Sequence, residues 1–71
     1  MLQRIRQRLR AVPFQPFEVR CSSGDVFRVE HPENAAVVGH SVTIALPGGE
    51  DVVTLSGLHI VGVVGADPIA A

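Results

Sequence analysis

The residues of this chain that are best suited to chemistry are its histidines, its cysteine and one glutamate, namely Cys21, His31, Glu33, His40 and His59. A histidine can serve as a general base or a metal ligand near neutral pH, and a thiolate can serve as a nucleophile. Pro32 holds His31 in an extended conformation, which could direct His31 and Glu33 into a groove as a polar site at the rim of the fold. The alternative is that the imidazole bonds to backbone or to Glu33 and only caps that rim.

The spacing of these groups matches no catalytic or metal-binding motif. The sequence contains no HExxH, no GxSxG and no glycine-rich phosphate loop that opens a helix. The single cysteine cannot pair within the chain, and no Cys/His cluster has zinc-finger spacing. Because Cys21 shares one face of the predicted strand with Val19 and Phe17, we expect it to be a buried, inert thiol. We therefore predict no enzyme, no metal and no cofactor.

The arginines form a second group of candidate functional residues. Residues 1–20 carry five arginines against Glu18, whereas residues 21–71 carry Arg28 against six acids, and the net charge is -1. One interpretation is that the basic and acidic parts neutralise each other on folding. The other is that the N-terminal arginines bind phosphates of a nucleic acid. The residues of that second interpretation are Arg4, Arg6, Arg8 and Arg10.

An amphipathic helix is predicted to carry those arginines. Leu2, Ile5, Leu9 and Val12 recur at helical spacing and predict one apolar stripe on a helix over residues 2–12. Pro13 ends the helix, because proline donates no hydrogen bond and restricts the residue before it. A helix this short does not persist alone in water, and we therefore expect its apolar stripe to dock on the sheet or on a neighbouring subunit. We predict no contact with a membrane.

From Phe17 onward apolar and polar residues alternate with the period of a β-strand. A three-residue loop, Ser22-Ser23-Gly24, places both apolar rows of the first hairpin on one face. In that register Cys21 faces Asp25, Val19 faces Phe27 and Phe17 faces Val29. Gly24 is predicted in the left-handed region that L-residues avoid.

The second half of the chain predicts a further hairpin. A two-residue Gly48-Gly49 turn pairs Ile44 with Val53 and Val42 with Leu55. Residues 35–38 form either a short additional strand or the start of a long bent strand interrupted at Gly39.

The last predicted strand, Leu58 to Val64, is apolar on both faces. We expect Leu58 and Ile60 on one face and Val61 and Val63, together with His59, on the other. A strand of this kind is normally covered on both sides. A chain of 71 residues buries only ~60% of its unfolded surface, so the second cover is predicted to be another copy. His59, Val61 and Val63 are the predicted interface of a homo-oligomer.

The fold class predicted from these elements is α+β, with an N-terminal helix followed by a strongly bent five-stranded antiparallel sheet. One domain spans residues 1–64, and residues 65–71 form a loose tail. This order, with its glycine turn and the strand, corner and strand of residues 53–60, resembles the small barrels of the SH3-like and Sm-like group. The chain also resembles a set of short uncharacterised bacterial proteins with a PFxPFxVxxxxGxxFxVxHPE stretch. The matching residues are Pro13-Phe14, Pro16-Phe17, Val19, Gly24, Phe27, Val29 and His31-Pro32-Glu33.

The Sm-like resemblance implies rings and RNA binding. Sm-type pockets use a basic residue near the final corner, whereas this corner is Ser56-Gly57-Leu58. The favoured hypothesis is therefore a soluble, cytoplasmic, non-enzymatic interaction module that self-associates. The sequence does not specify any other protein partner. The alternative is an Sm-like RNA-binding protein that uses the N-terminal arginines.

Overall fold

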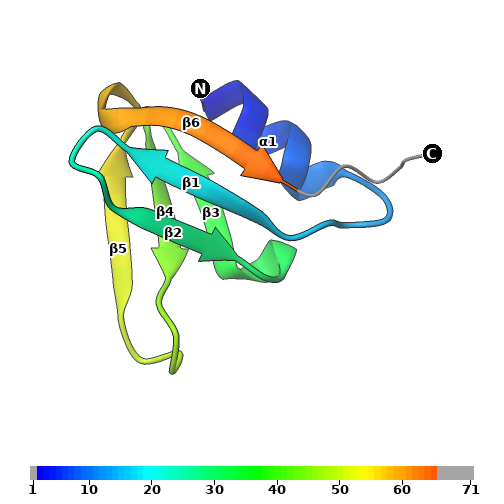
Figure 1. Ribbon diagram of the computed structural model, residues 1–71. Helices are drawn as coiled ribbons and strands as arrows, with labels where there is room; N and C mark the ends of the chain where they lie inside the picture. The colour runs from blue at the N-terminus through cyan, green and yellow to red at the C-terminus, as the bar shows by residue number, and fades with distance from the viewer. Residues whose placement is uncertain (1, 66–71) are drawn as a thin grey trace.

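The computed structural model describes residues 2–65, and residues 66–71 of the predicted tail lie outside this range. The chain forms an α+β domain in which one helix is followed by six strands (Figure 1). These elements are α1 (Leu2–Arg10), β1 (Phe17–Cys21), β2 (Val26–Val29), β3 (Ala35–Val38), β4 (Ser41–Ala45), β5 (Val52–Ser56) and β6 (Ile60–Gly65). Two short 3-10 helices, η1 (Pro32–Asn34) and η2 (Gly57–His59), form the corners before β3 and β6.

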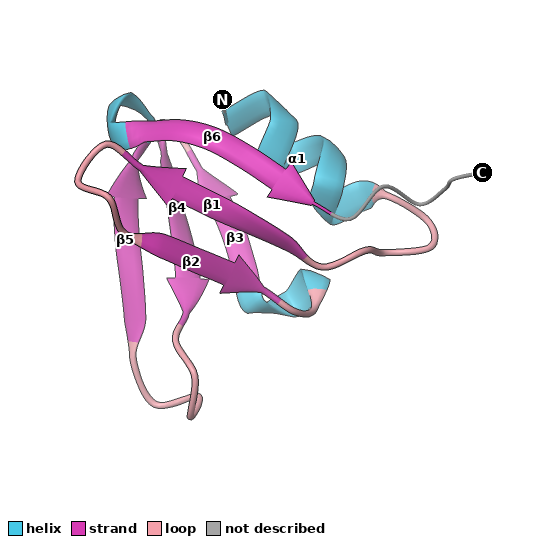
Figure 2. Cartoon of the chain, in the orientation of Figure 1, coloured by secondary structure: helices cyan, strands magenta, loops and turns pink. Residues whose placement is uncertain are grey.

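The strands make two three-stranded antiparallel sheets, in the orders β2-β1-β6 and β3-β4-β5 (Figure 2). The prediction of five strands in a barrel-like sheet is therefore wrong in both the strand count and the closure. Gly39 has a φ of 59°, and the turn at Gly39-His40 folds β3 back on β4 so that Val38 pairs with Ser41. Because this turn forms a hairpin, the chain on either side of Gly39 cannot be one long bent strand.

The predicted register of the first hairpin is confirmed. Phe17 pairs with Val29 and Val19 pairs with Phe27. The Cys21 amide donates to the Asp25 carbonyl at 2.9 Å across the three-residue loop. Gly24 has a φ of 97°, which only glycine adopts without strain.

The register of the second hairpin is also confirmed, because Ile44 pairs with Val53 and Val42 pairs with Leu55. Its turn differs from the prediction. The Gly49 amide donates to the Leu46 carbonyl at 3.0 Å, so Pro47 and Gly48 are the central residues of the turn. Proline favours the first of these positions and glycine favours the second, where φ is 99°.

The predicted faces of the last strand are wrong. β6 begins at Ile60, and Leu58 and His59 belong to η2. Cys21 pairs with Ile60 while Arg20 pairs with Gly62, so Val61 is an extra residue in a β-bulge. The bulge breaks the two-residue alternation and turns both Ile60 and Val63 into the core. Val61 is left 58% exposed, so Val61 and Val63 do not share a face.

The core lies between the two sheets and α1. Ile5 is completely buried, and Leu2 and Leu9 pack beside it as predicted for the apolar stripe. Val12 does not belong to this stripe, because α1 ends at Arg10 and Val12 is 95% exposed. The larger buried side chains are Ile5, Phe17, Val19, Val29, Val42 and Ile44.

The end of the predicted domain also shifts by one residue. Gly65, predicted as the first residue of a loose tail, is the last residue of β6 and pairs with Phe17. The ring of Phe14 lies 6.1 Å from the Phe17 ring in a tilted arrangement, which fixes the path from α1 into β1.

Candidate functional site

The outward side of β3-β4-β5 carries no charged side chain. Side chains alternate along each strand, so every second residue points away from the core. The outward residues, which we call the charge-free face, are Ala36, Val38, Ser41, Thr43, Ala45, Val52, Thr54 and Ser56. Thr43 and Thr54 lie opposite each other and their hydroxyl oxygens are 3.0 Å apart. Val38 and Val52 are 71% and 63% exposed, so this face is not covered within the described chain.

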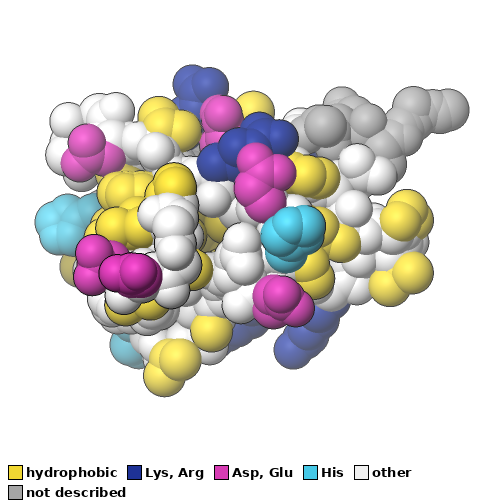
Figure 3. Space-filling model, turned by 90° about the horizontal axis from the view of Figure 1, so that it is seen from below, with side chains coloured by type: hydrophobic (Ala, Val, Ile, Leu, Met, Phe, Trp, Pro, Cys, Tyr) yellow, Lys and Arg dark blue, Asp and Glu magenta, His cyan; other side chains and the backbone are white. Residues whose placement is uncertain are grey.

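The outward side of β2-β1-β6 has a different character. Glu18 and Arg20 point outward from β1 and form an ion pair at 3.6 Å. Arg28 of β2 pairs with Glu30 just beyond the strand end. These paired charges are typical of a solvated face. The end of the molecule where the β4–β5 hairpin lies also carries a mixture of acidic, basic and hydrophobic side chains (Figure 3).

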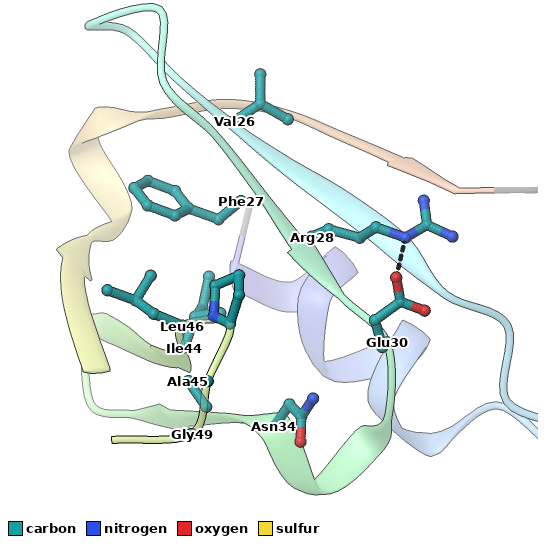
Figure 4. Close-up of a pocket in the computed structure, with 11 residues that line it drawn as sticks. Val26, Phe27, Arg28, Glu30, Asn34, Ile44, Ala45, Leu46 and Gly49 are labelled. Atoms are coloured by element: carbon teal, nitrogen blue, oxygen red, sulfur yellow. Dashed lines mark hydrogen bonds and ion pairs between the residues drawn. The ribbon is translucent and has the colours of Figure 1, made fainter. Parts of the chain in front are cut away.

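A hollow of about 510 Å³ opens between β2 and the β4–β5 hairpin. Phe27, Ile44 and Leu46 supply its apolar floor, and the Arg28–Glu30 pair and Asn34 lie along its rim (Figure 4). Because Glu30 already accepts a hydrogen bond from Arg28, the rim holds no free carboxylate base next to a second catalytic group. The hollow suits an apolar side chain better than a reaction.

The predicted arginines all lie on α1. Arg4 and Arg8 line, with Gln7 and Val63, a second hollow of about 310 Å³ beside β6. Within residues 2–65 no ion pair joins an α1 arginine to a carboxylate. The guanidinium of Arg8 packs on Gly65, where an added Cβ would lie 2.8 Å from its terminal nitrogen. The structure thus brings two of the four predicted arginines together.

The predicted polar residues all lie in turns or corners between strands. His31 precedes η1, and its exposed side chain makes no capping hydrogen bond there. Glu33 is also exposed. The predicted exposure of His40 in the β3–β4 turn is confirmed. His59 is exposed in η2, and its carbonyl accepts a 2.8 Å bond from the Ser22 amide.

The corner next to His40 holds a third hollow, of about 520 Å³. It is lined by Leu2, Gln3, His40, Ser56, Gly57 and Leu58. Leu58 is 92% exposed at its edge. No arginine, lysine or carboxylate lines it, so it offers a single imidazole among uncharged groups.

Cys21 is buried on the inner face of β1, as predicted. Burial, and to a smaller extent the negative charge of Asp25, raise the pKa of its thiol above the ordinary value. A raised pKa lowers the thiolate fraction, so the thiol is a poor nucleophile. Among residues 2–65 no three His, Cys, Asp or Glu side chains converge to hold a metal ion. In the same range no helix has the length and apolarity to cross a membrane.

No protein-family model, curated protein or solved structure matches this chain. The candidate site therefore has to be argued from the geometry alone. The surface with the most unusual composition is the charge-free face together with its open edge at β5. Sequence reasoning missed this surface, although the signal was present: the outward positions of β4 and β5 are serine, threonine, alanine and valine throughout.

Proposed function

We propose that this chain is a non-enzymatic, cytoplasmic assembly module that associates with further copies of itself. The observation that carries the proposal is the charge-free face, which lies beside the open edge of β5. Proteins that stay monomeric usually place lysine, proline or another charge on such edges. β3, β5 and β6 are all edge strands, and none of them contains a charged residue or a proline.

The small size of the domain supports the same proposal. A 71-residue chain buries a limited core, and association is one of the ordinary ways in which small domains gain stability. The N-terminal helix and the corner turn η2 before the last strand occur in the same order as in Sm-like proteins, which form rings, although the two sheets here do not close into a barrel.

The test is the mass of the purified protein in solution. Sedimentation velocity over a range from low micromolar to high micromolar chain concentration should show a mass that rises with concentration. A strict monomer over the whole range would contradict the proposal. Raised salt should leave the association intact, because no charge lies on the surface that carries it.

RNA binding through α1 is the second candidate. Arg4 and Arg8 lie one helical turn apart and line the same hollow, which favours phosphate binding there. A fluorescent single-stranded RNA should then bind at low salt and weaken as salt rises, and Arg4→Gln with Arg8→Gln should weaken it further. Unchanged binding in that double variant, or no binding at low salt, would remove this candidate.

A further inference from the structure

The free edge of β5 presents a regular set of backbone donors and acceptors. In an antiparallel ladder, residues alternately bond to one neighbouring strand and face the other side. The Leu46 amide bonds to the Asp51 carbonyl at 2.9 Å, and the Gly57 amide bonds to the His40 carbonyl at 2.8 Å. The residues of β5 that bond to β4 are therefore the odd-numbered ones. The N–H and C=O groups of Val52 and Thr54 and the N–H group of Ser56 point to the open edge. The Ser56 carbonyl is used within the chain, because Ser56 is the N-cap of η2 and accepts the first hydrogen bond of that turn.

These outward groups allow a second copy of the strand to pair about a two-fold axis at Thr54. If a second β5 runs antiparallel with Thr54 opposite Thr54 of the partner subunit, then Val52 lies opposite the partner's Ser56. The same pairing occurs again on the other side of the two-fold axis. The central Thr54 pair exchanges two bonds, and each Val52–Ser56 pair adds the bond from the Ser56 amide to the Val52 carbonyl, so about four inter-strand hydrogen bonds form.

We propose that two copies of this chain pair through β5 about a two-fold axis at Thr54, which makes one continuous six-stranded sheet from the two β3-β4-β5 sheets. The inference rests on the proposed self-association and names its surface and symmetry. A two-fold contact of this kind is self-complementary, because each copy presents the same residues to the other.

The side chains of β5 fit this arrangement on both faces. On the inner face Val53 lies opposite Leu55 of the partner subunit, and both are half-buried edge residues of the core. On the outer face the Thr43–Thr54 pair of one copy continues into the partner's pair, which extends the charge-free face across the axis. Apolar and threonine cross-strand pairs both stabilise sheets.

The charges next to β5 select the antiparallel direction. Glu50 and Asp51 precede the strand, and Gly57 and Leu58 follow it. Parallel pairing in register would place Asp51 beside Asp51 of the partner subunit, whereas antiparallel pairing places it beside the partner's Gly57. Like charges directly opposite each other destabilise a sheet, so the two-fold pairing avoids a penalty that the parallel one incurs.

The other edges suit this kind of pairing less well. β2 carries Arg28, whose partner on β1 is Glu18. β6 contains the bulge at Val61, which breaks the regular spacing of its outward groups. β3 lies against α1. β5 is therefore the regular, uncharged and uncovered edge of the described fold (Figure 1).

Cysteine cross-linking tests the register and the symmetry together. Opposed residues of a hydrogen-bonded pair have Cα atoms about 5.5 Å apart, within the range of a disulfide. Thr54→Cys should therefore form a disulfide-linked dimer under mild oxidation. Val52→Cys and Ser56→Cys are the matched controls, because each meets its own copy only at about 13 Å along the strand. The two controls should cross-link only when mixed with each other, and Cys21, buried in every variant, serves as the shared background.

A second variant removes the central donor of the edge, and its only loss within the fold is the Thr43–Thr54 hydroxyl contact. The Thr54 amide points away from β4, so Thr54→Pro breaks no β4–β5 backbone hydrogen bond but removes the central donor of the proposed pair. It should stay folded by circular dichroism and raise the dimer dissociation constant at least about tenfold, since two central bonds are lost.

The outcomes separate this inference from the proposed function. Association of the wild type with no more cross-linking at position 54 than at position 52 would overturn the two-fold β5 pairing and leave self-association standing through another surface, such as β5 against β6 in a ring. A wild type that stays monomeric would overturn both. Preferential cross-linking at position 54 together with a monomeric Thr54→Pro supports both.

Discussion

The two sheets bury similar inner rows and present different outer faces. In β2-β1-β6 the inner row holds Phe17, Val19 and Val29, and the outer face carries four charges in two ion pairs. In β3-β4-β5 the inner row holds Val42 and Ile44, and the outer face carries no charge. The inner rows therefore account for the fold, and only the outer faces distinguish a surface suited to water from one suited to a second copy.

The largest expected effect comes from a substitution in the buried inner row of β2-β1-β6. Phe17→Ala should destabilise the domain by about 3 to 5 kcal/mol, because it removes the largest fully buried side chain and leaves a cavity. That loss approaches the total stability of a domain this small. Urea unfolding followed by circular dichroism measures it.

The matched control lies on the charge-free face. Val38→Ala should change the free energy of unfolding by no more than about 0.5 kcal/mol, because Val38 is 71% exposed. Equal losses for Val38→Ala and Phe17→Ala would mean that the outer face is also a structural layer, which would end the distinction between the two sides of the sheet.

A smaller effect compares one turn from each sheet. Gly24 ends the β1–β2 loop with a φ of 97°, and Gly39 begins the β3–β4 turn with a φ of 59°. An alanine at either position should cost about 1 to 2 kcal/mol, because its Cβ disfavours positive φ. No heavy atom crowds a Cβ at either site, so backbone conformation is the only cause.

Asparagine substitutions should have different effects on stability in the two turns. Gly39→Asn should cost less than Gly39→Ala, because asparagine tolerates the left-handed helical region near φ 59°. Gly24→Asn should recover less of the stability that Gly24→Ala loses, because φ at Gly24 lies well beyond that region. The free energies of unfolding of the four variants, measured side by side, test this order, and equal recovery at both sites would contradict it.

The smallest effect concerns the thiol, which lies only in β2-β1-β6. The folded-state pKa of Cys21 is raised, so folding favours the neutral thiol. The stability that follows from this is complete below the unfolded-state pKa and is lost as the pH rises through the folded-state pKa, in the alkaline range. Cys21→Ala should flatten this part of the stability curve. An unchanged alkaline slope in urea unfolding between pH 7 and the onset of alkaline unfolding would assign the loss to other groups.

The hairpin registers could be predicted from the sequence because two independent signals agree there. Alternating apolar rows have to face the core, and a glycine at the turn fixes which residues lie opposite each other. The pairs Val19–Phe27 and Ile44–Val53 follow directly from this. Tertiary structure adds little to that choice.

The sequence-based predictions fail where the local pattern of residues and the tertiary pairing of strands disagree. The apolar run of β6 fits either face, so only its pairing with β1 decides that Val61 is a bulge and Val63 is buried. Gly62 was the available signal, because glycine inside a strand often marks a bulge. The sequence also contained a signal that the helix ends before Val12. The residue before a proline disfavours the helical conformation, and α1 does end at Arg10.

The connectivity of the two sheets has a kinetic consequence. All of β3-β4-β5 comes from one continuous stretch, Ala35 to Ser56, whereas β1 pairs with β6 only after the intervening chain has closed into a long loop. Pairings close in sequence form faster than distant ones. The three-strand meander is therefore expected to assemble first, and the return of β6 to β1 to complete folding.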